Sequence, residues 1–218
     1  MRKLIPGLTG LLLAAGFSIW AYPQLPEQVA THFNLHGEPN GWSSRTLATW
    51  LIPVLGLAVA LVFLVLPKID PRGANYAKFG STYWTIVNAV LIFLAGLHAV
   101  TLGKALGWNV SINRVLAVAM GALFVLLGSL MTRIQPNWFV GIRTPWTLSS
   151  DTVWRKTHQF GGTVFVLAGV CVFVAAFLPA TWEVYVLVTA IVVASLATVV
   201  YSYLVWREEQ KGGSAAAR

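Results

Sequence analysis

The sequence has few charged residues and a single cysteine. Asp, Glu, Lys and Arg make up 10% of its 218 residues, against about 25% in a typical soluble domain. This scarcity of charge, beside a hydrophobic content of 57%, argues against a soluble globular domain. Cys171 has no second cysteine to pair with, which excludes an internal disulfide. Its apolar surroundings predict a small packing residue.

Long apolar runs fill most of the chain. A helix needs about 20 predominantly apolar residues to cross the hydrocarbon core of a bilayer, and Pro or Gly follows most of these runs, as expected where a helix ends. Ala117 and Gly121 are four residues apart and predict a face for close helix packing. We therefore predict an all-α, polytopic integral membrane protein, a six-helix transmembrane bundle with spans at residues 4–22, 47–66, 83–102, 114–131, 163–179 and 183–205.

The basic residues are distributed unevenly between the two sides of this bundle. Twelve of the fifteen Lys and Arg lie on the side of the two termini, and loops rich in these residues normally stay in the cytoplasm. We therefore predict cytoplasmic termini, an extracytoplasmic loop at 23–46 and a cytoplasmic loop at 132–162. Topology accounts for the net charge of +8, so the expected partner is the lipid bilayer, with no direct nucleic acid.

The extracytoplasmic loop contains a strong turn signal. Glu38-Pro39-Asn40-Gly41 combines a proline suited to the second turn position with the Asn-Gly pair of a tight bend. We expect a compact hairpin there, with Trp42 at the lipid interface. His32 and His36 are four residues apart, a spacing that on a helix resembles some zinc sites. Gly37 interrupts any such helix and no third ligand is definite, so these remain weak metal candidates and we expect no metal.

The cytoplasmic loop is polar and aromatic, in contrast to the rest of the chain. The residues before Pro145 should be extended, and Ser149 or Ser150 can then cap a helix that has Asp151 in its first turn. On that helix four residues lie on one face, because they are three or four positions apart in the sequence. They are Trp154, Thr157, His158 and Gly161.

Two residues of this loop allow two interpretations each. His158 is either a proton-sensitive switch or a structural histidine hydrogen-bonded under Trp154. Arg143 either binds a partner's carboxylate or a lipid phosphate, or is a positive-inside anchor of the loop. The only acidic residue of the loop is Asp151, at the predicted cap, and no phosphate-binding or dinucleotide motif is present. We therefore expect neither an enzyme nor a cofactor.

Both loops resemble known protein families. The cytoplasmic loop resembles the signature of the SdpI family of bacterial immunity proteins, and the residues that carry this resemblance are Asn137, Gly141, Arg143, Thr144, Pro145, Trp146, Trp154, Thr157 and His158. The outer loop is similar to a separate N-terminal domain of unknown function that often precedes that signature. Its candidate residues are His32, Asn34, Gly37, Gly41 and Trp42.

The resemblance implies a multi-pass protein of the bacterial cell membrane that gives resistance to a secreted peptide toxin of the sporulation-delaying type. It also implies signalling, in which the protein sequesters a cytoplasmic transcriptional repressor at the membrane. We divide the chain into an N-terminal membrane domain at 1–66, an SdpI-like membrane domain at 67–210 and a disordered tail at 211–218.

Two other functions stay open from the sequence. A small-molecule or peptide transporter often keeps polar or ionisable residues within its spans, and His98 and Asn88 are the candidates here. A metal-dependent membrane enzyme would be built on His32 and His36 outside, or on His158 inside.

Overall fold

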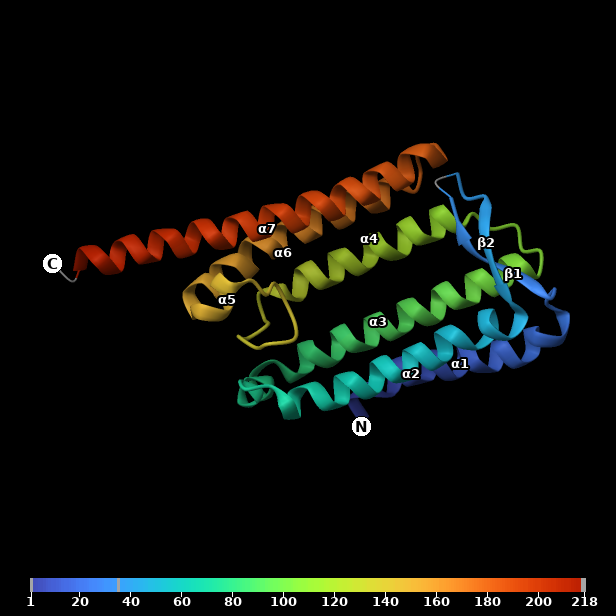
Figure 1. Cartoon of the computed structure of the whole chain (residues 1–218), viewed down its shortest axis with the longest axis horizontal. Coiled ribbons are helices and arrows are strands. Elements are labelled where there is room, and N and C mark those ends of the chain that lie inside the picture. The colour runs from blue at the N-terminus through green and yellow to red at the C-terminus, as the bar shows by residue number, and fades with distance from the viewer. Residues whose placement is uncertain (1, 35, 217–218) are drawn as a thin grey trace.

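Six long helices make up most of the computed structural model, which describes residues 2–34 and 36–216 (Figure 1). The long helices are α1 (Ile5–Ala21), α2 (Arg45–Ile69), α3 (Tyr76–Ala105), α4 (Ile112–Met131), α6 (Asp151–Ala175) and α7 (Ala180–Ala216). All six are long and apolar enough to cross a membrane, which confirms the predicted six-span architecture. The shorter elements are α5 (Pro145–Ser149), the strands β1 (Gln28–Phe33) and β2 (Pro39–Ser44), and the 3-10 helices η1 (Arg2–Leu4), η2 (Tyr22–Gln24) and η3 (Gly73–Asn75).

The long helices form two groups of three. Helices α1, α2 and α3 pack on one another, and α4, α6 and α7 form the second group (Figure 1). An apolar groove of about 670 Å³ runs between α3 and α4. The boundary between the groups therefore falls between α3 and α4, and the division of the chain after residue 66 stays a prediction.

Glycines bring α4 and α6 into backbone contact. A Cβ atom added to Gly121 of α4 would lie 2.8 Å from the carbonyl oxygen of Gly169 in α6. One added to Gly128 would lie 2.7 Å from the carbonyl oxygen of Gly162. Small residues are favoured at such crossings because lipid gives helices no hydrophobic reason to associate, so close packing must supply the attraction. The packing face predicted around Gly121 is confirmed.

The two strands form an antiparallel hairpin at one end of the bundle, which we call the hairpin end. The expected compact hairpin is therefore present, but the predicted turn at 38–41 is wrong, because Pro39, Asn40 and Gly41 lie in β2. The chain reverses earlier. The Asn34 side-chain oxygen accepts the backbone N–H groups of His36 and Glu38 at 2.9 and 3.0 Å, and Gly37 takes a positive φ of 76°.

Several predicted helix limits differ from the structure. The span expected at 163–179 belongs to a helix that starts earlier, at Asp151, and ends at Ala175. Helix α7 continues to Ala216, into the region predicted as a disordered tail at 211–218, and residues 217–218 lie outside the described residues. Cys171 is exposed on α6, so its predicted packing role is wrong.

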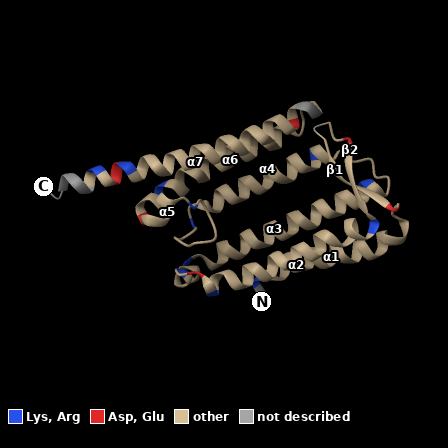
Figure 2. Ribbon diagram, viewed as in Figure 1, with Lys and Arg blue, Asp and Glu red and all other residues tan. Residues whose placement is uncertain are grey.

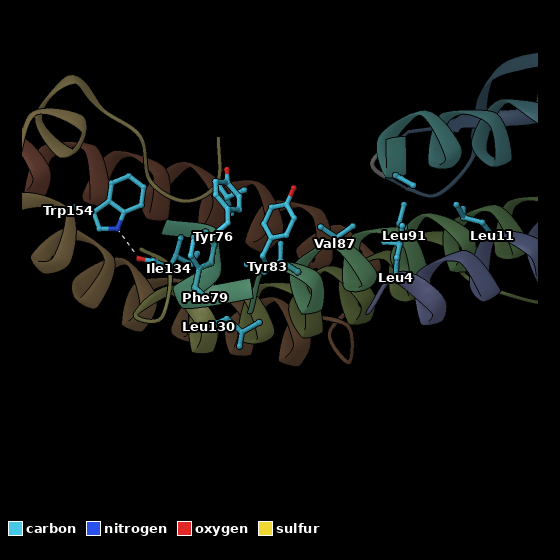
Figure 3. Close-up of a cluster of buried hydrophobic side chains, with 13 residues drawn as sticks. Leu4, Leu11, Tyr76, Phe79, Tyr83, Val87, Leu91, Leu130, Ile134 and Trp154 are labelled. Atoms are coloured by element: carbon cyan, nitrogen blue, oxygen red, sulfur yellow. Dashed lines mark hydrogen bonds between the residues drawn. The ribbon is translucent and has the colours of Figure 1, made fainter. Parts of the chain in front are cut away.

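The largest apolar core lies at the end opposite the hairpin, which we call the loop end. It includes Tyr76, Phe79 and Tyr83 of α3, and it reaches Leu130 of α4 and Trp154 of α6 (Figure 3). This core therefore joins the two helix groups. Charged residues gather toward the ends of the bundle and leave its middle apolar (Figure 2), as a membrane-spanning structure requires.

Candidate functional site in the signature loop

The candidate site is built on the chain between α4 and α6, residues 132–150, which we call the signature loop. It lies at the loop end and contains the short helix α5 (Figure 1). Few of its backbone groups pair with one another, so side chains supply most of the hydrogen bonds that fix its shape.

Asn137 is fully buried and folds the first part of the signature loop around its amide. Its Oδ1 accepts the backbone N–H groups of Phe139 and Val140 at 2.9 and 2.7 Å. Its Nδ2 donates to the carbonyl oxygens of Gln135 and Val140, both at 2.9 Å. One side chain thus pairs with four backbone groups, and the two that belong to Val140 are buried and would otherwise lack a partner.

Thr144 and Thr147 start helix α5. Thr144 is extended, with φ −114° and ψ 163°, as predicted for a residue before proline. Its Oγ1 accepts the N–H of Thr147 at 3.2 Å, and the Oγ1 of Thr147 accepts the N–H of Thr144 at 2.9 Å. This reciprocal capping box is tied to α7, because Thr144 Oγ1 lies 3.0 Å from Ser202 Oγ.

The predicted face of α6 is buried against the signature loop. Trp154, Thr157, His158 and Gly161 are all buried, and Ser150 caps the helix by accepting the N–H of Val153. Trp154 donates its Nε1–H to the carbonyl oxygen of Ile134 at 2.9 Å (Figure 3). The shared face and the cap predicted from sequence are therefore confirmed. Thr157 Oγ1 is buried and has no hydrogen-bond partner among the described residues.

His158 uses both ring nitrogens. The backbone N–H of Ile142 donates to Nε2 at 3.1 Å, so Nε2 must be unprotonated. Nδ1 then carries the proton and donates to the carbonyl oxygen of Trp154 at 2.8 Å. The imidazole also stacks on the Trp154 ring, with centroids 4.1 Å apart. This arrangement matches the interpretation of His158 as a structural histidine and not as a proton-sensitive switch. A second proton, on Nε2, would face the Ile142 N–H.

Gly141 makes the contact of Ile142 with His158 possible. Its φ of 108° is disfavoured for residues with a side chain, and a Cβ atom there would collide with His158 Nε2. The signature therefore has a glycine at position 141 because a side chain there would not fit.

The connection between α2 and α3 supplies residues that the sequence reasoning missed. Asp70 accepts the N–H of Trp138 on its Oδ2, and the hydroxyl of Tyr76 donates to the same oxygen, each at 2.9 Å. Arg72 forms a salt bridge of 2.6 Å with Asp151, and Asn75 donates to the carbonyl oxygen of Pro136 at 2.8 Å. The available signal was Asp70 itself, one of only seven acidic residues, placed between two apolar spans and next to a proline.

The outward surface of the site is aromatic and basic. Arg143 is exposed and donates from Nη1 to the carbonyl oxygen of Trp138 at 3.1 Å, and the Trp138 side chain is 49% exposed. Arg155 and Lys156 are also exposed, as expected from their positions on α6. Trp146 instead turns toward α7, where it contacts Tyr203 with ring centroids 5.1 Å apart.

The outer-loop candidates lie at the other end of the bundle. His32 is exposed and bonds through Nδ1 to Asn40 Oδ1, while Gly41 faces it across the hairpin, where a Cβ atom would lie 2.9 Å from that of His32. Trp42 is exposed on β2, and His36 is exposed near the turn. In residues 2–34 and 36–216, no group of three or more His, Cys, Asp or Glu is placed to hold a metal.

The two polar residues within the spans bond to neighbouring helices. His98 Nε2 lies 2.7 Å from Ser18 Oγ, which donates to the carbonyl oxygen of Thr49. Asn88 accepts the N–H of Gly7 at 2.9 Å and donates to the carbonyl oxygen of Lys3 at 2.8 Å. Both side chains therefore connect helices of the first group.

These features define a helical, multi-pass membrane protein with a rigidly bonded loop at one end and a small hairpin at the other. Residues 133–202 match the SdpI/YfhL protein family, and residues 9–57 match a domain of unknown function (DUF1648). The chain therefore carries an SdpI/YfhL family region, preceded by a DUF1648 region toward its N-terminal end. The expected family and the bacterial membrane location are thereby confirmed.

The similarity to one characterised relative extends over nearly the whole chain. The sequence is 28% identical over 203 residues to the immunity protein SdpI of Bacillus subtilis (strain 168), covering 93% of this chain and 95% of that protein. No solved structure matches the chain. Residues 70–76, which hold the signature loop, lie outside both matched regions.

Proposed function

We propose that this protein is an immunity protein, which protects the cell that carries it from a secreted peptide toxin of the sporulation-delaying type. The observation that carries this proposal is the similarity to the immunity protein SdpI over nearly the full length of both chains. It is supported by the signature residues, because Asn137, Gly141 and His158 act together to build one loop.

The proposed orientation puts the hairpin outside the cell and the signature loop in the cytoplasm. By the bounds of their helices and connections, Lys68, Arg72, Arg133, Arg143 and Arg155 lie in or beside the loop end, whereas Arg45, Lys104 and Arg114 belong to the hairpin end. Basic residues favour the cytoplasmic side. The toxin would then meet the hairpin or the outer ends of the spans.

The exposed surface of the signature loop fits a role in signalling through a cytoplasmic repressor. Arg143 and Trp138 offer a cationic and an aromatic contact on a loop that bonds to the α2–α3 connection and to α7. A toxin can change this loop only if it binds two arrangements of the protein with different affinities. The bonds between the signature loop and the α2–α3 connection are the contacts that such a rearrangement would alter.

The test is survival of a toxin-sensitive bacterium that expresses this protein and is exposed to a sporulation-delaying-type peptide. Wild type should protect, and Arg143→Ala should lose protection at equal membrane levels measured by immunoblot. Arg155→Ala is the matched control, because it removes an exposed arginine beside the same loop. Equal survival with wild type and Arg143→Ala would contradict the role of the signature loop, and killing of cells with wild type would contradict immunity to this peptide.

A further inference from the structure

The carboxylate of Asp70 collects three hydrogen-bond donors from two segments of the chain. Its Oδ1 accepts the N–H of Arg72 at 2.7 Å, and its Oδ2 accepts the Tyr76 hydroxyl and the Trp138 N–H. Asp70 is only 7% exposed. All three donors are uncharged, so the carboxylate is held by hydrogen bonds and not by a salt bridge of its own.

Two side chains thus hold the two ends of the Trp138 main chain. Asp70 accepts its N–H at 2.9 Å, and Arg143 donates to its carbonyl oxygen at 3.1 Å. Tyr76 adds a link to the buried side of the signature loop, since its hydroxyl lies 3.4 Å from Asn137 Oδ1. The acceptor of the Arg143 guanidinium is the Trp138 carbonyl oxygen, so the position of Trp138 determines where this hydrogen bond forms.

We propose that Asp70 is a positioning residue of the signature-loop site, which acts through the main chain of Trp138 to orient Arg143. This inference rests on the proposed function and extends its site to residues 70–76, a segment outside both matched family regions. The functional unit then comprises the α2–α3 connection together with the signature loop, and Asp70 contributes without facing any partner itself.

The first experiment measures amide hydrogen exchange of the purified full-length protein in detergent micelles. In Asp70→Ala the segment 137–143 should exchange about tenfold faster or more, because the Trp138 N–H loses its acceptor, while α4 and the second half of α6 keep wild-type rates. Asp70→Asn retains one acceptor oxygen and should fall between wild type and Asp70→Ala. Asp151→Ala is the matched control, since it removes an exposed carboxylate of the same end without touching Trp138.

Two exchange results would overturn the proposal. Unchanged exchange at 137–143 in Asp70→Ala would show that Asp70 does not hold the loop. Faster exchange throughout the protein would show a general loss of stability in place of local positioning. This readout needs no toxin, so it decides the positioning role even if wild type fails to protect cells and the proposed function falls.

The second experiment uses a double mutant to test whether Asp70 affects protection through Arg143. If Asp70 acts through Arg143, survival with Asp70→Ala and Arg143→Ala combined should equal survival with Arg143→Ala alone, at a sub-lethal toxin dose that leaves a measurable signal. Asp70→Asn should recover part of the protection lost in Asp70→Ala. A double mutant clearly worse than either single variant would mean that Asp70 acts by another route.

Discussion

The hairpin and the signature loop are two connections of similar length that are stabilised in different ways. In the hairpin, backbone groups of β1 pair with backbone groups of β2, and most side chains point outward. In the signature loop, the N–H groups of Trp138, Phe139, Val140 and Ile142 are all accepted by side chains. Backbone pairing between strands tolerates many residue types, whereas a loop whose hydrogen bonds come from side chains depends on those side chains.

This difference predicts where substitutions are costly. Exposed strand residues of the hairpin should be replaceable with little effect on stability, because the strand hydrogen bonds remain. The buried residues of the signature loop whose side chains bond to the backbone should each be costly to replace, because their removal leaves backbone groups without partners. The following predictions, from the largest expected effect to the smallest, test that contrast by unfolding the purified protein with SDS in micelles.

Asn137→Ala should have the largest effect, a loss of about 3 kcal/mol or more in the free energy of unfolding, because each buried group left without a partner costs about 1–3 kcal/mol. Asn40→Ala, which removes an exposed hairpin amide that bonds to His32, is the matched control and should stay close to wild type. Similar losses in both variants would remove the distinction between the two connections.

Gly141→Ala should cost about 2–3 kcal/mol, since a positive φ costs about 1–2 kcal/mol for a residue with a side chain and the new Cβ atom collides with His158. Gly37→Ala in the hairpin shares the positive φ, but its Cβ atom would meet Asn113 at an ordinary 3.5 Å. It should therefore cost only the backbone strain. An equal loss at both sites would mean that contact with His158 contributes nothing.

Trp154→Phe should cost about 1–2 kcal/mol, because the ring volume is largely kept while the carbonyl oxygen of Ile134 loses its donor. Tryptophan fluorescence is unsuitable as the readout in a chain with ten tryptophans, so the unfolding curve is followed by circular dichroism. A change below about 0.5 kcal/mol, the usual range of neutral surface substitutions, would show that water replaces the lost donor.

His32→Ala should have the smallest effect, within about 0.5 kcal/mol of wild type, as is usual for exposed positions. Its ring is exposed and its hydrogen bond to Asn40 lies on the hairpin surface. A large loss here would mean that side chains hold the hairpin as well, and the contrast between the two connections would fail.

Much of the fold follows from the sequence because it depends on local patterns. The apolar runs predict the six spans, and Ser150 with Asp151 predicts the start of α6 from cap chemistry alone. The turn of the hairpin was misplaced because Pro39-Asn40-Gly41 carries the stronger local signal. Bonds from the Asn34 side chain to His36 and Glu38 decide the turn instead.

The sequence pattern singles out the residues of the candidate site, but it does not predict their contacts. The spacing of Trp154 and His158 predicts their shared face, yet the role of His158 depends on an N–H brought from Ile142 by the loop. Asp70 was missed for the same reason, since Trp138 is distant from it in the sequence. Contacts of this kind follow from tertiary structure, which no local pattern encodes.

The bonds of Asn88 have a consequence for the surrounding bilayer. Because Asn88 lies well inside α3 and binds Lys3 and Gly7, α1 begins far from the loop end of α3. Helix α1 has 17 residues, or about 26 Å, whereas α2 has 25 residues, or about 37 Å. The apolar thickness of the protein thus varies around its circumference. Lipid beside α1 therefore meets a shorter apolar surface than lipid beside α2, so a bilayer with shorter acyl chains should suit the α1 side of the protein better than the α2 side.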